Sequence, residues 1–336
     1  MDQAVDRSFR LLGARFLRKQ AKRLAMQIAP TCLAKDTEGV HQSRVASRRL
    51  RAALELFADC FPAESVDRWQ KALRRVTRGF GPARDQDVHI LFLAEHLAHV
   101  TDSAHTRGIA TLLGRLERDR ARSQAKVIKV ADRFRQSGVL AEILDTSQAI
   151  CARAKTKETT VRSPLTVERA ERCLAERFAE LNSEAGGLRD PAAIEQHHAM
   201  RIVAKRLRYT MEMLAPVFGH QWDASIRAAK QLQTLLGDIH DYDVWDERID
   251  LFEQKMRQRA VKHFGTEAPL ATLEVGLEQL RTHCRRRRSE IFDELCAFWN
   301  EQPFSEIEPP CSATSRDLED SLGKCKHGRT VCRETR

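Results

Sequence analysis

The sequence predicts an all-α protein, and three observations support this fold class. Apolar residues recur at helical spacing up to about residue 300, and alternating runs of β-branched residues do not occur. The 15 glycines and 10 prolines lie mostly at the ends of the periodic segments. Because hydrophobic residues make up 42% of a 336-residue chain, we expect cores for two domains of ordinary size.

The first domain is expected to span residues 1–155. The Gly81-Pro82 pair should interrupt its helices, because proline lacks the N–H that a helix interior needs. Helices are predicted over residues 5–28, before Pro62, over residues 64–80, from Arg84 onward and over residues 107–134.

Residues 153–165 lose apolar periodicity and are predicted to link the first domain to a second over residues 165–300. Ser163 is expected to cap the next helix, with Pro164 at its first position. The second domain follows the same plan as the first. Its first two helices are predicted from about residue 165 to Gly186-Gly187 and from a cap at Asp190-Pro191 onward. Three further helices are predicted over residues 222–236 before Gly237, from Asp241 onward, and through residues 281–288.

Residues 303–336 are polar and are expected to form a disordered tail. In this tail Cys325, His327 and Cys332 resemble part of a zinc site, but their spacing matches no finger pattern, so no metal is predicted. Nine cysteines without a secreted-domain pattern favour a reduced, cytoplasmic protein. The chain starts without an apolar signal segment and has no long apolar run, so we expect no membrane association.

A basic stretch that occurs twice is the strongest functional signal. The formal charge of +10 and the pI near 9.3 favour anionic partners without identifying them. The first copy reads His41-Gln-Ser-Arg44-Val-Ala-Ser-Arg48-Arg49-Leu50-Arg51. Almost half a chain length later, it recurs as His198-Ala-Met-Arg201-Ile-Val-Ala-Lys205-Arg206-Leu207-Arg208. Such a repeat indicates an internal duplication.

Helical geometry gathers the charges of each copy on one face. At about 100° per residue, four side chains of the first copy fall within roughly 80° of one another: His41, Arg44, Arg48 and Arg51. Ala46 and Leu50 lie nearly opposite, and no acidic residue interrupts either stripe. Like charges one turn apart cost a helix about 0.2–0.5 kcal/mol per pair. A repeated, acid-free stripe therefore favours a polyanion site over an ordinary solvated helix face.

A second motif follows each stripe. Gly81-Pro-Ala-Arg84-Asp85-Gln-Asp87-Val88 recurs as Gly237-Asp-Ile-His240-Asp241-Tyr-Asp243-Val244. Its carboxylates would repel a polyanion that they faced alone, whereas the helix dipole favours them at a helix start. We expect helix-start positions and salt bridges to the stripe arginines for Arg84, Asp85, Asp87, His240, Asp241 and Asp243. A divalent cation that bridges the carboxylates to phosphate is the alternative.

With both motifs in both halves, residues 5–300 resemble the CHAD family, the conserved histidine α-helical domain. The resemblance implies two four-helix bundles related by a pseudo-twofold axis, with a basic central pocket or channel. It also implies binding of inorganic polyphosphate and association with polyphosphate granules. Many members are fused to a CYTH domain, whose Glu-x-Glu-x-Lys signature we do not find, so a stand-alone protein is expected. The second copy departs at Lys205 and His240, which replace arginines and retain a potential cation.

The stripe residues are the first candidates for contact with a phosphate chain. Arginine donates two parallel hydrogen bonds to phosphate oxygens and stays charged. Arg49 and Arg206 point about 100° away from the stripes, and they either contact phosphate or pair with the carboxylates of the second motif. The predicted polyphosphate-binding residues are His41, Arg44, Arg48, Arg49, Arg51, His198, Arg201, Lys205, Arg206 and Arg208.

Three roles remain open for His41 and His198: contact with phosphate when protonated, metal binding, or structural capping. Basic residues on other helices are expected to add secondary contacts to polyphosphate. These are Arg18, Lys22, Lys71, Arg74, Arg78, Arg115, Arg118, Arg122, Arg227, Lys230, Arg281, Arg285 and Arg288.

The leading hypothesis is a protein that binds inorganic polyphosphate without catalysis, metal or cofactor. Nucleic acid is the alternative partner, but aromatic residues make up 6% of the chain, so platforms for base stacking are scarce. A metal-assisted hydrolase or transferase of phosphoryl groups is the third hypothesis, with the carboxylates of the second motif as its candidate machinery. Phosphoryl transfer through histidine is chemically feasible, yet the sequence supplies no nucleotide-binding loop.

Overall fold

The computed structural model describes residues 6–32, 37–301 and 304. Within these ranges the chain folds into helices and their connections, without a strand. The all-α prediction is therefore confirmed. The tail that we expect to be disordered, with its cysteines and His327, lies outside the described residues apart from Phe304.

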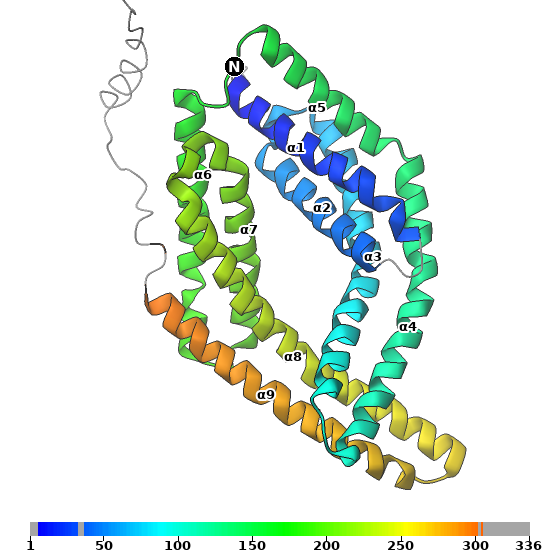
Figure 1. The fold of residues 1–336 in the computed structure, drawn as a ribbon. Coiled ribbons are helices and arrows are strands. Elements are labelled where there is room, and N and C mark those ends of the chain that lie inside the picture. The colour runs from blue at the N-terminus through cyan, green and yellow to red at the C-terminus, as the bar shows by residue number, and fades with distance from the viewer. Residues whose placement is uncertain (1–5, 33–36, 302–303, 305–336) are drawn as a thin grey trace, which may run out of the picture.

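The first half of the described chain contains five α-helices. They are α1 (Arg7–Ile28), α2 (Thr37–Leu56), α3 (Ala63–Ala98), α4 (Ser103–Gln136) and α5 (Val139–Thr156), with short 3₁₀ helices η1 (Pro30–Cys32) and η2 (Ala58–Cys60). Helix α1 packs against α2 and α5, α2 packs against α3, and α3 packs along α4. In Figure 1, α1, α2 and α5 lie at the upper right, and α3 and α4 extend downward from them. Because α5 runs to Thr156, it includes the first residues of the expected linker.

The second half of the described chain contains four α-helices. They are α6 (Pro164–Ser183), α7 (Ile194–Phe218), α8 (Asp223–Phe264) and α9 (Ala271–Asn300), with 3₁₀ helices η3 (Ala185–Arg189), η4 (Gly219–Trp222) and η5 (Ala268–Leu270). Each of these α-helices packs against the next along the chain. None of the described helices combines the length and apolar character needed to cross a membrane.

The start of α6 follows the sequence prediction and also joins the two halves. The backbone N–H of Thr166 donates to the Ser163 hydroxyl (3.2 Å), and Pro164 occupies the first helical position. The Thr166 hydroxyl donates to the carboxylate of Asp6 (2.7 Å), which also accepts hydrogen bonds from the first turn of α1. One polar network therefore anchors the first turns of α1 and α6.

The predicted helix break at Gly81-Pro82 is wrong, because α3 continues through both residues. Pro82 removes one N–H and crowds the carbonyl of Arg78, which costs a helix about 3 kcal/mol. Its neighbours Phe80 and Ala83 are buried in the core, so burial of this face outweighs the local penalty. Helix α8 likewise continues through Gly237. Neither copy of the second motif starts a helix.

The predicted cap at Asp190-Pro191 is also displaced. Helix α7 begins at Ile194, and its N-cap residue Ala193 makes no side-chain hydrogen bond. The carboxylate of Asp190 accepts instead from the N–H of Ala192 (2.8 Å). Asp190 thus stabilises the turn that leads into the helix rather than the helix itself.

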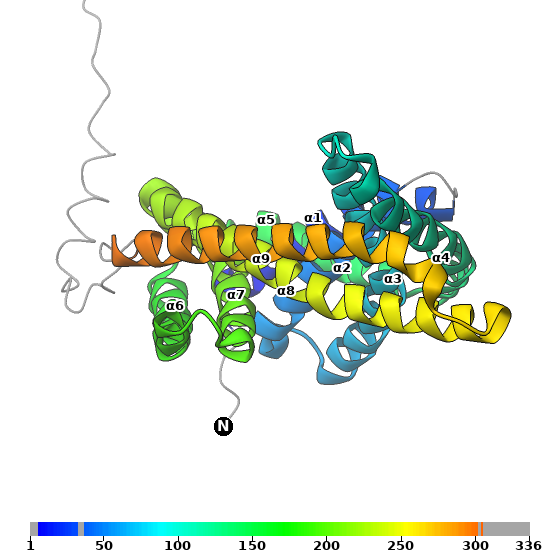
Figure 2. The ribbon, with the colours of Figure 1, turned by 90° about the horizontal axis from the view of Figure 1, so that it is seen from below.

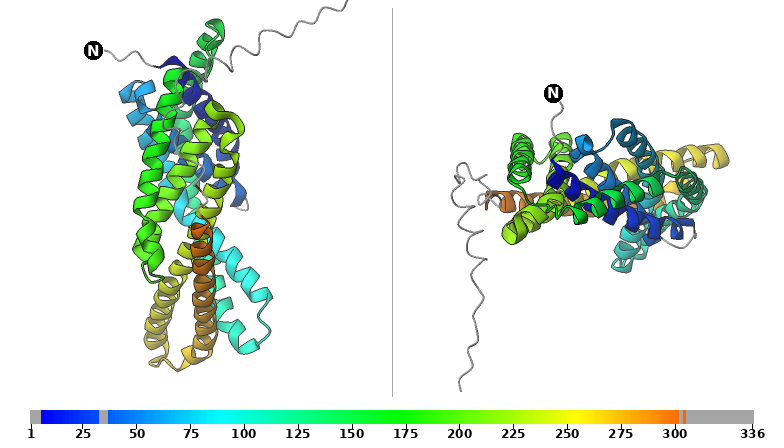
Figure 3. Two further views of the ribbon diagram at one scale, coloured as in Figure 1. Left: turned by 90° about the vertical axis from the view of Figure 1, so that its left-hand side faces the viewer. Right: turned by 90° about the horizontal axis from the view of Figure 1, so that it is seen from above.

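The two halves meet at two separate places. Helices α1 and α2 pack against α7, and α4 packs against α9. At the second junction α8 and α9 run side by side to the far ends of α3 and α4 (Figure 2; Figure 3, left). These four helices share an apolar core, to which they contribute Leu93, Leu112, Trp245 and Leu280 in chain order. Most of the remaining core residues form one larger cluster that spans both halves.

Two glycines allow α4 and α9 to cross with their backbones in contact. A Cβ atom at Gly108 would lie 2.1 Å from the carbonyl oxygen of Leu273, and one at Gly276 would lie 2.1 Å from the carbonyl oxygen of His105. Because these neighbours are backbone atoms, no side-chain movement relieves the clash. The crossing therefore depends on glycine in both helices.

Candidate functional site

Helices α2 and α7 carry the two basic stripes and pack against each other. A guanidinium nitrogen of Arg48 on α2 donates to the hydroxyl of Tyr209 on α7 (2.8 Å). The next residue on α2, Arg49, donates to the carboxylate of Glu212 on α7 (2.9 Å). These bonds fix α2 against α7, so the stripes from the two halves converge on one region.

Four cations form the centre of this region, and we call them the cationic cluster: Arg44 and Arg48 on α2, with Arg201 and Lys205 on α7. Burial lowers the pKa of Arg44 and of Arg201, and neighbouring cations of the cluster lower both further. Burial, followed by the charges of Arg48 and Arg201, lowers the pKa of Lys205 to about 8. The side chains of the cluster repel one another across the two halves.

Two carboxylates border the cluster without neutralising it. Arg44 forms an ion pair with Asp85 on α3 at 3.7 Å, and it also donates to the carbonyl oxygen of Thr77 (3.1 Å). Asp241 on α8 is an exposed residue, yet desolvation of its carboxylate raises the pKa to about 6 against the opposing charge of Arg201. Asp241 is therefore partly protonated in mildly acidic solution, which reduces its repulsion of an anion.

The other carboxylate of each second motif is held by an arginine of the following helix. Asp87 on α3 accepts from Arg120 on α4 at 2.5 Å, and only 4% of the Asp87 side chain is exposed. Asp243 on α8 forms the corresponding ion pair with Arg288 on α9. These pairs join α3 to α4 and α8 to α9. They engage arginines outside the stripes, whereas Asp85 forms the expected ion pair with the stripe residue Arg44.

His41 and His240 are poor cations. Burial lowers the pKa of His41, and the charge of Arg84 lowers it further. The ring of His240 lies 4.8 Å from that of exposed His198, measured between centroids. Burial and the charge of Arg201 lower the pKa of His240 to about 4. His240 is therefore neutral near pH 7 and does not replace the cation of the arginine found at this position in the first copy, Arg84.

The ends of the stripes differ from their centre. Arg208 donates to Gln233 (2.7 Å) and to Glu212 (3.0 Å), the carboxylate that also accepts from Arg49. Arg49 therefore pairs with Glu212 and not with a carboxylate of the second motif. Burial lowers the pKa of Arg51, and the charges of Arg74 and Arg78 on α3 lower it further. Arg206 points outward and is exposed.

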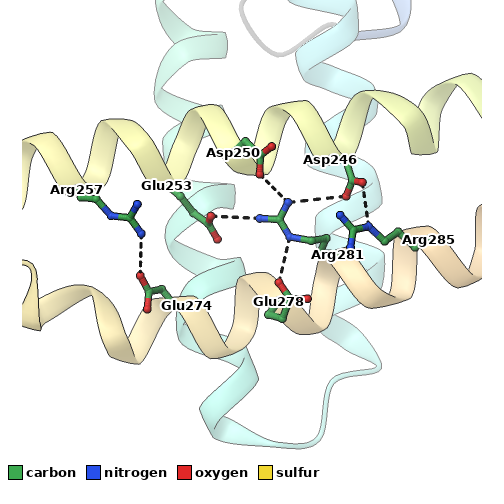
Figure 4. A network of polar contacts seen from close by, with 8 residues as sticks. All are labelled: Asp246, Asp250, Glu253, Arg257, Glu274, Glu278, Arg281 and Arg285. Carbon is green, nitrogen blue, oxygen red and sulfur yellow. Dashed lines mark hydrogen bonds and ion pairs between the residues drawn. The ribbon is translucent and has the colours of Figure 1, made fainter. Parts of the chain in front are cut away.

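Several of the predicted secondary contacts are engaged within the protein. Arg281 has four carboxylate partners, Asp250 at 2.6 Å, Glu278 at 3.1 Å, Glu253 at 3.2 Å and Asp246 at 3.9 Å (Figure 4). Only 10% of its side chain is exposed, so the structure argues against contact with a polyanion. Arg285 pairs with Asp246 (3.0 Å) in the same network.

The other predicted secondary contacts fall into two groups. Arg115 and Arg122 both pair with Asp119 on α4, and Arg288 is held by Asp243. The remaining residues lie on the surface of α1, α3, α4 and α8, where Arg18 is half-buried and the others are exposed: Arg18, Lys22, Lys71, Arg74, Arg78, Arg118, Arg227 and Lys230.

Sequence reasoning missed Tyr209, Glu212 and Arg120. Arg120 had a detectable signal, because Leu112, Leu116 and Arg120 recur at four-residue intervals on one face of α4 and all are buried. A charged residue on an apolar face indicates a buried partner. Tyr209 and Glu212 act between halves, so no local pattern marks them. Among the described residues, no group of three or more His, Cys, Asp or Glu is placed to hold a metal ion.

The fold and the site place this protein among all-helical domains in which two basic helices from separate halves converge. The CHAD domain family model matches residues 15–250. This is more than half of the chain, and the protein therefore belongs to the CHAD domain family.

Solved structures share the fold at low sequence identity. The crystal structure of the CHAD domain from the plant Ricinus communis matches with a TM-score of 0.58 and 20% identity, over 86% of this chain and 91% of that one. PptA from Streptomyces chartreusis matches with a TM-score of 0.51 and 16% identity, over 86% of this chain and 98% of that one. At such identities the likeness establishes the fold alone. No curated protein sequence matches the chain.

Proposed function

We propose that this protein binds inorganic polyphosphate at the cationic cluster and does not transform it chemically. Membership of the CHAD family supports a phosphate polymer as the ligand. The observation that carries the proposal is the convergence of Arg44 and Arg48 with Arg201 and Lys205, in which burial and the charge of Arg48 lower the pKa values of the other three. A cytoplasmic location and association with polyphosphate granules are part of the same proposal.

Electrostatics favours a polyanion at this position. Holding like charges together raises the free energy of the unliganded protein, and a phosphate chain between them turns repulsion into attraction. Arginine forks match phosphate oxygens, and partial burial strengthens each charge-assisted hydrogen bond. Because the cluster draws two cations from each half, one phosphate chain that spans it contacts both halves.

The carboxylates of the second motif support binding without catalysis. A phosphoryl hydrolase of the kind considered above would need free carboxylates to hold a metal or activate water. Asp87 and Asp243 are each paired with an arginine, and Asp85 pairs with Arg44. These carboxylates are engaged in holding helices and cations in place.

Charge reversal of one arginine in each half tests the proposal. The Arg44→Glu/Arg201→Glu variant should bind polyphosphate about 100-fold more weakly, because two contacts become repulsive. Should this variant lose helicity in circular dichroism, Arg44→Gln/Arg201→Gln provides the second measurement, with an expected loss of about tenfold. For the native protein, the slope of log K against log salt concentration should be about −3, as four contacts with a flexible chain require.

The matched control reverses two exposed arginines outside the cluster. Arg23→Glu/Arg172→Glu, on α1 and α6, changes the net charge by the same amount and should leave affinity within about twofold at physiological salt. Equal losses in the control and in the cluster variant would mean that net charge alone drives binding. Unchanged affinity in the cluster variant would place the site elsewhere.

Two further measurements separate the proposal from its alternatives. Duplex DNA or RNA at equal phosphate concentration should fail to displace polyphosphate, and displacement would favour a nucleic-acid protein. Incubation of the native protein with polyphosphate and Mg²⁺ should release no orthophosphate above the level of the cluster variant. Release that depends on Asp87 or Asp243 would instead establish an enzyme.

A further inference from the structure

A second concave site lies outside the cationic cluster, in a groove between α3 and α4. Its volume is about 620 Å³, within the range of small-molecule sites. The floor is apolar: half-buried Ala72 on α3 and Val130 on α4 form its accessible part, over Val76 and Phe134, which are buried. A Cβ atom at Gly79 would lie 2.7 Å from a methyl carbon of Val130, so glycine allows Val130 to rest against the backbone of α3. The floor is thus a close-packed apolar surface that a ligand can cover.

The rim of this groove carries four cations, with Ser137 as its one uncharged polar residue. Arg75 and Arg78 border it from α3, and Lys126 and Arg133 border it from α4. All four side chains are exposed, and none of them forms an ion pair among the described residues. The positive charge extends beyond the groove, because Arg78 also lies close enough to Arg51 on α2 to oppose its protonation. No carboxylate lines the groove.

The two parts of the groove select for different parts of a ligand. An apolar floor is desolvated favourably only by an apolar group, so an inorganic anion would leave it wet. The rim attracts negative charge and repels cations. On α3 the groove extends from Ala72 to Gly79, about 10 Å along the helix. The length and the lining together fit a compact molecule rather than an extended polymer.

We infer that the groove between α3 and α4 binds an anionic amphiphile, a molecule with an apolar body about 10 Å long and a carboxylate or phosphate head. The body covers the exposed parts of Ala72 and Val130, and the head lies against the cations of the rim. This inference does not depend on polyphosphate binding, because none of its residues belongs to the cationic cluster.

Binding of decanoate and of decyl phosphate to the full-length protein, measured by calorimetry below their aggregation concentrations, tests the inference. Both should bind, and their relative affinities decide between a carboxylate and a phosphate head. Neutral decanol should bind with an affinity at least about tenfold lower. Ala72→Trp, which fills the groove, should abolish binding. Lys126→Glu/Arg133→Glu keeps the floor and should weaken binding about tenfold, so the test survives if the tryptophan variant misfolds.

Arg107→Glu is the matched control, since Arg107 is exposed on the same helix about 28 Å from Lys126. It should bind decanoate as the native protein does. Equal affinity for decanol and decanoate, or native affinity in Lys126→Glu/Arg133→Glu, overturns the inference. The inference is also overturned if neither amphiphile binds and an acidic peptide binds in the groove instead. Arg44→Glu/Arg201→Glu should bind decanoate normally, which distinguishes failure here from failure of polyphosphate binding.

Discussion

Two arginine-rich regions of this protein look alike in sequence and differ in the folded state. In the cationic cluster between α2 and α7, Arg44, Arg201 and Lys205 lie near one another and near Arg48, with Asp85 and Asp241 at the border. Between α8 and α9, Arg281 is surrounded by four carboxylates from both helices. The first region keeps cations close together, as the proposed polyphosphate site requires, whereas in the second region the positive charge is neutralised in joining two helices. The number of basic residues therefore does not identify a binding site. The charges of the residues that pack around them do.

The largest effect on stability should come from removing the cation of the α8–α9 network. Arg281→Ala leaves four carboxylates close together without their counter-ion, and unfolding free energy should fall by about 2 kcal/mol, less than for a fully buried pair because the carboxylates are partly exposed. Polyphosphate affinity should stay within about twofold. Denaturant titration and binding measurements on one preparation check both. A large loss of affinity would show that the two regions do not differ as proposed.

The opposite pattern is expected for Lys205 in the cationic cluster. Lys205→Gln removes a half-buried charge from among cations, so unfolding free energy should rise by about 1 kcal/mol. Polyphosphate affinity should fall about tenfold, as for one charge-assisted contact. The same denaturant and binding assays apply. Destabilisation by this substitution would mean that the cluster, like the α8–α9 network, is a structural element.

The pH dependence of binding should show which cations are available. Lys205 is charged below its pKa of about 8, and polyphosphate binds the charged form, so affinity should fall between pH 7 and pH 9. Between this pKa and the ordinary value of 10.5, the folded protein holds fewer protons than the unfolded chain, so stability should rise with pH there. Lys205→Arg should remove both trends. Persistence of the affinity decrease in that variant would assign it to another group.

The smallest effect is expected at the border of the cluster. Asp241→Asn removes a negative charge near the proposed path of the phosphate chain and should raise affinity about twofold to threefold at pH 7. Below its pKa of about 6 Asp241 is largely protonated, so the variant and the native protein should converge at pH 5. Titration of both proteins at the two pH values is the measurement. An equal gain at both pH values would point to a structural effect of the amide.

Helix content and the stripes could be read from the sequence because both are local patterns. Apolar periodicity predicted helices close to the observed bounds of α1 and α4, and Ser163-Pro164 predicted the start of α6. The break at Gly81-Pro82 was the corresponding error. A single proline is a strong local signal, but the burial of Phe80 and Ala83 is a tertiary effect that sequence windows do not contain.

The candidate site was predictable only in part, for a similar reason. Helical phase placed Arg44 and Arg48 on one face, but not opposite Arg201 and Lys205, since that requires α2 and α7 to pack together. The same limit applied to Arg281, whose carboxylate partners on α8 are distant in sequence. The pKa values of Lys205 and His240 also depend on charges from other helices.

By itself the sequence determined that this chain is helical and that it carries two acid-free basic stripes, because both follow from the order of neighbouring residues along a helix. Only the tertiary structure decided which basic residues lie among other cations and which are enclosed by carboxylates. It brought the stripes of α2 and α7 together, and it enclosed Arg281 between carboxylates of α8 and α9. Electrostatic energy depends on distance and burial rather than on sequence separation, so it is set when the helices pack.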